Sequence, residues 1–165
     1  MRRPWLLCLG VMFGACATLG ADRGSRVVKQ EVIPGGSAIV VVAEGDFEPR
    51  SVGSYSVRAY TAANPRFPFD DFIAGTVRPR DGTVDLVGFS DLDHDGSPEI
   101  IVLIRSAGSG AYLSADAFQL RGTVLMLLET VSGLAKDADP IRALEAKLTH
   151  RAEPRAAPDA DKPRR

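Results

Sequence analysis

The chain of 165 residues contains only two cysteines, Cys8 and Cys16, and both lie near its start. The rest of the chain therefore has no disulfide and no thiol chemistry, although we expect it to enter an oxidising compartment. About 130 residues remain between the two terminal segments described below, enough for one domain and too few for two. That domain must be held together by core packing alone.

Catalytic motifs are also missing. Only two histidines occur, His94 and His150, and neither has a predicted neighbour arranged as in a Ser-His-Asp triad. There is no G-x-S-x-G elbow, no phosphate-binding glycine loop with lysine, no H-E-x-x-H and no cysteine pair for zinc. The adjacent pair Asp70 and Asp71 points apart on a strand or turn, as solvated residues do. These absences argue against an enzyme and favour a binding module.

Neither sign of charge dominates the chain. Twenty Lys and Arg face 21 Asp and Glu, which leaves a formal net charge of −1. No concentrated basic stripe with interleaved aromatics is present, so we predict no nucleic-acid partner. Residues 151–165 combine proline, alanine and charge without apolar periodicity, and this composition predicts a disordered tail.

The first residues have the pattern of a secretory signal peptide. Two arginines follow the initial methionine, a mainly apolar stretch comes next, and an Ala-x-Ala cleavage site ends at Ala17. The apolar stretch is too short and too interrupted by glycine for a comfortable membrane span. We predict a signal peptide over residues 1–21 and an exported domain over residues 26–150.

A second processing route stays open at the same segment. Cys16 follows Phe13-Gly14-Ala15, which resembles a degenerate lipobox with phenylalanine where leucine is usual. Cleavage before Cys16 with lipidation of its thiol would anchor the protein to the cell envelope instead of leaving it soluble in the periplasm. Contact with a membrane is expected only in that case.

The body of the chain has the period-2 alternation of β-strands, seen for example in "GSYSVRAY". "VVKQEVI" and "AIVVVAEG" flank the turn "PGGS", and "EIIVLIR" is apolar on both faces, as a central strand would be. Glycine and aspartate turns separate these runs. The pattern predicts a mainly β domain, an antiparallel sandwich or barrel of about eight strands.

One short helix is expected at the C-terminal end of the domain, in "DADPIRALEAKLTH". Asp139 can cap its free N–H groups and Pro140 fits the first helical position. The apolar stripe formed by Ile141, Leu144 and Leu148 is narrow. We therefore expect this helix to cap a sheet edge or an open end of the domain.

An acidic loop, "DLDHDGSPEI", precedes the central strand. Oxygens of Asp91, Asp93, Asp95 and Glu99 could converge on one Ca²⁺. The glycine after the third aspartate, Gly96, would allow the sharp turn. The match to an EF-hand is incomplete, because Val102 stands where the bidentate glutamate belongs. The other interpretation is a tight turn in which the aspartates bond their own backbone, with no metal.

The segment "RSAGSGAYLSADAF" follows the central strand. The small residues Ser106, Gly108, Ser109 and Gly110 give a loop of little bulk, and Tyr112 is its one large group. Small residues let a backbone enter a narrow cleft, and a tyrosine anchor has few torsions to freeze on binding. Taken alone, the pattern also fits an ordinary connection between strands. The flanking charges, Arg105 and Asp116, could add contacts at the rim of the loop, but they are interpreted as solubilising surface residues.

The wider sequence resembles the periplasmic inhibitors of invertebrate-type (i-type) lysozyme. The resemblance covers about Val41 to Leu144, and its most specific parts are the Ser-Gly-x-Tyr element from Ser109 to Tyr112 and the acidic loop before it. It implies an exported antiparallel β-sandwich that blocks host lysozyme, is not an enzyme and can form a homodimer. Related families use similar elements against other lysozymes, so the i-type assignment depends on the wider resemblance.

The resemblance also implies roles for residues of the loop. In the family, the serine and tyrosine of this element enter the substrate cleft of the lysozyme. Ser109 and Tyr112 would do so here, with Gly110 permitting the loop's shape. A lysozyme cleft presents two catalytic carboxyls, to which hydroxyl groups can donate charge-assisted hydrogen bonds. The alternative function is a calcium-stabilised, β-rich adhesion or scaffolding module of the envelope.

Overall fold

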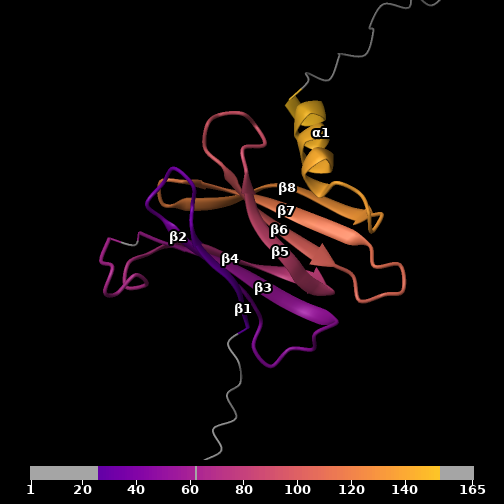
Figure 1. Ribbon diagram of the computed structural model, residues 1–165, viewed down its shortest axis with the longest axis horizontal. Helices are drawn as coiled ribbons and strands as arrows, with labels where there is room; N and C mark the ends of the chain where they lie inside the picture. The colour runs from indigo at the N-terminus through magenta and orange to yellow at the C-terminus, as the bar shows by residue number, and fades with distance from the viewer. Residues whose placement is uncertain (1–25, 62, 153–165) are drawn as a thin grey trace, which may run out of the picture.

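The computed structural model describes residues 26–61 and 63–152, which form two antiparallel four-stranded sheets and one helix (Figure 1). Each sheet is a meander, because its strands are neighbours in chain order. The first sheet contains β1 (Val27–Val32), β2 (Ile39–Glu44), β3 (Val52–Tyr60) and β4 (Phe72–Asp81). The second contains β5 (Thr83–Ser90), β6 (Glu99–Arg105), β7 (Leu113–Arg121) and β8 (Val124–Leu134), and is followed by α1 (Pro140–Ala152). The predicted sandwich of about eight strands with one C-terminal helix is confirmed.

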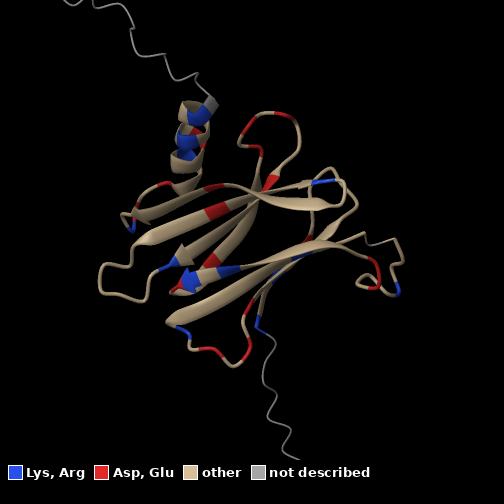
Figure 2. Ribbon diagram, turned by 180° about the vertical axis from the view of Figure 1, so that it is seen from behind, with Lys and Arg blue, Asp and Glu red and all other residues tan. Residues whose placement is uncertain are grey.

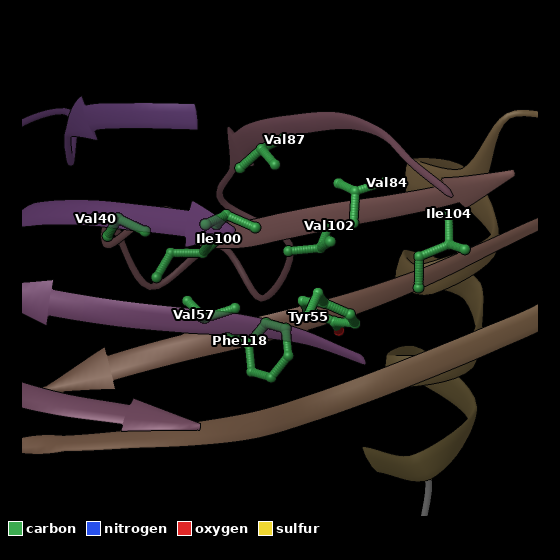
Figure 3. Packing of buried hydrophobic residues seen from close by; sticks show 10 residues of the cluster. Val40, Tyr55, Val57, Val84, Val87, Ile100, Val102, Ile104 and Phe118 are labelled. Atoms are coloured by element: carbon green, nitrogen blue, oxygen red, sulfur yellow. The ribbon is translucent and has the colours of Figure 1, made fainter. Parts of the chain in front are cut away.

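The main core fills the space between the two sheets (Figure 3). On β3 the expected alternation is present, since Tyr55, Val57 and Ala59 are fully buried and the residues between them are not. The inner faces contribute the ten buried residues Val40, Val42, Tyr55, Val57, Val84, Val87, Ile100, Val102, Ile104 and Phe118. Because the core contains no disulfide, burial of these apolar side chains is its main source of stability.

Strand β6 is central, as its two apolar faces predict. It pairs with β5 on one side and β7 on the other. Ile100 and Val102 face the first sheet, whereas Ile101 belongs to a second apolar cluster on the outer face of the same sheet. A strand covered on both faces carries a continuous apolar run, because no face is left for polar residues.

The helix begins where the sequence predicts. The Asp139 carboxylate accepts hydrogen bonds from the backbone N–H groups of Ile141 at 3.0 Å and Arg142 at 3.2 Å. These bonds satisfy two of the N–H groups that the first turn leaves without partners in the helix.

The helix lies beside the edge strand β8, where Lys147 donates to the carbonyl of Thr130, so the expectation that it caps a sheet edge is met in part. It also covers part of the outer face of the second sheet. Leu144 is fully buried and packs on the outer face of the second sheet, in a cluster with Ala115, Ala117 and Val131. The two alanines leave room on β7 for a helix to approach, and the apolar outer face of β6 and β7 needs a cover. A narrow stripe suffices because Leu144 is the fully buried residue of the helix, with Ala143 and Leu148 partly buried beside it.

The chain passes from the first sheet to the second at Gly82. This residue has φ +124, and its N–H donates to the carbonyl of Ser51 at 2.7 Å. A Cβ atom at this position would lie 1.9 Å from the carbonyl oxygen of Arg105 at the end of β6. The corner therefore requires glycine both for its φ and for the close approach of another strand's backbone.

Several sequence predictions fall on residues outside this description. They are the signal peptide over residues 1–21, the lipidation of Cys16 and residues 153–165 of the predicted tail. The first two residues of that predicted tail, 151 and 152, instead belong to α1. Within residues 26–61 and 63–152, no helix is long and apolar enough to cross a membrane. Pairing of two copies through an edge strand stays a prediction.

Candidate functional site

The loop between β6 and β7, residues 106–112, is called the key loop below. It projects from one end of the second sheet, at the right of Figure 1. Its base is closed by a hydrogen bond from the N–H of Ser106 to the carbonyl of Tyr112 at 2.9 Å. Its tip is closed by a second bond, from the N–H of Ala111 to the carbonyl of Gly108 at 3.0 Å. These bonds give the loop a defined shape before any partner arrives.

The tip of the key loop is exposed and uncharged. Tyr112 is 55 % exposed, and Gly108, Ser109 and Gly110 are exposed as well. Figure 2 shows the loop free of the charges that mark the acidic loop. Neither the Ser109 hydroxyl nor the Tyr112 hydroxyl forms a hydrogen bond to another residue in the described part of the chain. Both hydroxyls can therefore bond to a second molecule.

Gly110 leaves space for the ring of Tyr112, a detail that the sequence alone does not indicate. A Cβ atom there would lie 2.4 Å from Cε2 of Tyr112, so the tyrosine ring lies directly over this glycine. The left-handed residue of the loop is its neighbour Ala111, with φ 44. Gly110 thus permits the loop's shape by leaving space under the ring, and the ring is held against the loop backbone.

Asp116 corrects one interpretation from the sequence, because it is only 4 % exposed and is not a surface residue. Its carboxylate accepts hydrogen bonds from the Tyr55 hydroxyl, from Oγ1 of Thr130 at 2.6 Å and from Nε of Arg78 at 3.4 Å. Burial, together with the bond to Asp116, raises the pKa of Tyr55 well above its usual value. Tyr55 therefore stays a neutral hydrogen-bond donor.

This buried network could have been found from the alternation of β7. Asp116 has the same parity as Phe118, which belongs to the core between the sheets. A carboxylate on the inner face of a strand must find donors, since an unpaired buried charge is costly. The donors come from β3, β4 and β8, and no local pattern in the sequence indicates them.

The acidic loop brings together three of the four predicted carboxylates. Oxygens of Asp91, Asp93 and Glu99 lie within 4.8 Å of one another. Asp95 is turned away and pairs with Arg121 at 2.8 Å. Nε2 of Gln119 donates to Asp93 at 3.2 Å and to Glu99 at 3.1 Å. An amide donor therefore already bridges two of the three converging carboxylates.

The backbone of the acidic loop uses other oxygens of the cluster, whereas Oδ1 of Asp91 is buried without a hydrogen-bond partner among the described residues. The N–H of Gly96 donates to Asp91 at 3.1 Å, the N–H of Leu92 to Glu99 at 2.8 Å, and Gly96 has φ +87. Burial raises the pKa of Glu99, against the effect of the Leu92 bond. These contacts are those of a tight turn that bonds its own backbone. The loop lies at the opposite end of β6 from the key loop, so it does not contribute to the same surface.

Calcium is therefore expected to add little to the stability of this protein. A cation at the cluster would have to displace the Gln119 amide and recruit further oxygens, because Ca²⁺ takes six to eight ligands. We expect the melting temperatures in 2 mM Ca²⁺ and in EGTA to agree within about 1 °C, because a ligand adds little stability when its concentration is well below its Kd. A rise of several degrees in Ca²⁺ that disappears in the Asp93→Asn variant would show a calcium site and contradict this expectation.

The sequence and the fold are similar to those of known proteins. The family model for the periplasmic lysozyme inhibitor of I-type lysozyme matches residues 25–148. A crystal structure of the periplasmic lysozyme inhibitor of I-type lysozyme from Aeromonas hydrophila is similar, with 50 % sequence identity and a TM-score of 0.67. That match covers 70 % of this chain and 97 % of the other.

A second similar structure is the Aeromonas hydrophila inhibitor in complex with Meretrix lusoria lysozyme. It also shows 50 % identity and a TM-score of 0.67, and the match covers 71 % of this chain and 94 % of the other. No curated protein matches the chain. The family match spans both sheets, the key loop and most of the helix, so the chain belongs to the family of periplasmic lysozyme inhibitors of I-type lysozyme.

Proposed function

We propose that this protein inhibits I-type lysozyme in the periplasm by placing the key loop in the enzyme's substrate cleft. It is a protein inhibitor of a glycoside hydrolase and not itself an enzyme. The observation that carries the proposal is the loop tip, which is exposed, uncharged and furnished with two unbonded hydroxyls at Ser109 and Tyr112. A relative with 50 % identity was crystallised with a lysozyme, which supports the choice of partner.

The chemistry of the loop suits a lysozyme cleft. Lysozymes use two carboxyl groups, one as general acid and one as nucleophile or stabiliser. The Ser109 and Tyr112 hydroxyls can donate hydrogen bonds to such groups, and each bond to a charged acceptor contributes about 1.5–3 kcal/mol. The loop brings no charge of its own that would have to lose its water. Once seated, it excludes both the glycan and the attacking water.

The hydrogen bonds inside the loop reduce the cost of binding. Ordering a flexible loop at an interface costs conformational entropy, which reduces the affinity. Here the bonds from Ser106 to Tyr112 and from Ala111 to Gly108 define the backbone already, and the ring of Tyr112 lies over Gly110. We therefore expect inhibition without a large rearrangement of the inhibitor.

The test is the clearing of a peptidoglycan suspension by I-type, chicken-type and goose-type lysozymes, each with and without the purified domain. We expect the I-type enzyme to lose its activity near an equimolar ratio and the other two to need a large excess. Heat-denatured protein is the control for non-specific adsorption to the substrate. Unchanged clearing by several I-type enzymes at a tenfold excess of folded protein would overturn the proposal.

A further inference from the structure

A polar groove lies beside the key loop, where the edges of the two sheets meet. It has a volume of about 440 Å³. Its walls come from the end of β4, from the key loop and from the facing segments of β7 and β8. Tyr112 and Ser106 line it on the side of the key loop. A partner that receives Tyr112 in its cleft must therefore lie across or close to this groove.

Arg78 is the side chain that gives the groove a positive charge. It lines the groove from β4, and its side chain is 32 % exposed. Its Nε–H donates to Asp116, whose own carboxylate is buried. A guanidinium has five N–H donors in a fixed plane, so this one bond leaves donors at the exposed end. Asp116 therefore fixes the orientation of Arg78 without using all of its binding capacity.

The other lining groups offer mostly hydroxyl donors. Ser114 and Ser132 line the groove from β7 and β8, next to Thr130. Asp116 also lines it, but its oxygens already accept three donors, from Tyr55, Thr130 and Arg78.

Two more charged residues line the groove at the end of β4. Arg80 is directed at backbone carbonyls, and Asp81 is an exposed carboxylate. The one partly exposed positive group is therefore Arg78, which faces the groove together with uncharged hydroxyls.

We infer that this groove is a second contact site for lysozyme, in which Arg78 binds a carboxylate side chain from the rim of the substrate cleft. The inference rests on the proposed function and adds a specificity contact outside the key loop. Arginine is suited to this role because its planar donors match a carboxylate and its charge strengthens the hydrogen bonds. Asp116 is a positioning residue that acts through Arg78.

The test compares inhibition constants for Arg78→Met, Arg78→Lys and the control Arg142→Met, which removes an exposed arginine on α1, remote from the groove. We expect Arg78→Met to raise the inhibition constant for I-type lysozyme about ten- to a hundredfold, as the loss of one partner of a hydrogen-bonded charge pair does. Arg78→Lys should retain part of the affinity, and Arg142→Met all of it. Melting temperatures show whether each variant is folded.

Salt dependence distinguishes a carboxylate from a neutral acceptor. The inhibition constant of the wild-type protein should rise more steeply between 20 and 300 mM NaCl than that of Arg78→Met, because screening weakens only the charged contact. Equal slopes would overturn the carboxylate assignment. Equal inhibition constants for Arg78→Met and Arg142→Met, in a protein that still inhibits, would overturn the groove contact and leave the proposed function intact.

A double-mutant cycle tests the positioning role of Asp116. Asp116→Asn keeps the size of the side chain but replaces one oxygen by a donor, which opposes the Nε–H of Arg78. If Asp116 acts through Arg78, the substitution should weaken inhibition in the wild-type background and have little further effect in the Arg78→Met background. Additive losses would show that Asp116 acts on inhibition by another route.

Discussion

The double substitution Ser109→Ala with Tyr112→Ala is expected to abolish measurable inhibition while the domain stays folded. Both side chains lie in the exposed key loop and form no hydrogen bond to another residue in the described part of the chain, so the fold loses little. The proposed complex would lose the two hydrogen bonds to the catalytic carboxyl groups, together about 3–6 kcal/mol. That loss corresponds to an inhibition constant roughly a hundred- to ten-thousandfold higher. Titration of lysozyme activity measures the inhibition constant, and thermal melting measures the fold.

A matched control removes an exposed serine and an exposed aromatic elsewhere, as in Ser97→Ala with Phe67→Ala. This variant should inhibit like the wild-type protein. Tyr112→Phe separates the two parts of the tyrosine, because it keeps the ring over Gly110 and removes only the hydroxyl. Wild-type inhibition by the Ser109→Ala, Tyr112→Ala variant would show that the key loop is not the part of the protein that enters the cleft.

The second large effect concerns stability, and it is expected at Arg80. This side chain is 0 % exposed, and its ion pair with Glu44 measures 3.7 Å. Glu44 in turn accepts from Arg26 at 2.8 Å and from the N–H of Val84 at 2.9 Å. The Arg80 guanidinium also donates to four backbone carbonyls, those of Pro49, Arg50, Ser54 and Gly82. The network ties the β2–β3 loop to the corner between the sheets.

Arg80→Met is expected to lower the free energy of unfolding by about 3–5 kcal/mol. The substitution leaves buried carbonyls without donors and removes one of the positive charges that neutralise the Glu44 carboxylate. Domains of this size have a total stability of only about 5–15 kcal/mol, so this loss should lower the urea midpoint clearly. Urea denaturation of the variant and of Arg142→Met measures the difference. A midpoint for Arg80→Met equal to that of Arg142→Met would show that the network contributes little.

The sequence predicts the strands well because their alternation is local, but it predicts poorly which face of β4 is buried. In "TVRPRD" Val77 alternates with Arg78 and Arg80, and hydrophobicity alone favours burial of the valine. The structure shows the reverse, with Val77 67 % exposed and Arg80 buried. Burial of Arg80 depends on Glu44 and on carbonyls of the β2–β3 loop, about 30 residues away. Such long-range pairing leaves no periodic signal in the sequence.

Long-range contacts in the proposed binding surface, formed by the key loop and the groove, are likewise not predictable from the sequence. The small residues of the key loop and its tyrosine are adjacent in the sequence, so the loop is predictable as a unit. Arg78 and Asp116 are 38 residues apart and meet only because β4 and β7 face each other across the sandwich. In the acidic loop, the spacing predicts the convergence of Asp91 and Asp93 but not the amide of Gln119 that bridges Asp93 and Glu99.

The Gly82 corner limits how the proposed inhibitory surface can be altered. The base of the key loop is clamped, because Gly82 abuts the carbonyl of Arg105 and Ser106 is bonded to Tyr112. The five residues between Ser106 and Tyr112 form no hydrogen bond to the rest of the sandwich in the described part of the chain. These five residues can therefore be exchanged as a unit, while the strand ends that hold them stay in place. Other loop sequences could be grafted there to fit clefts of other shapes. A side chain at Gly82, by contrast, would displace the end of β6 from which the key loop begins.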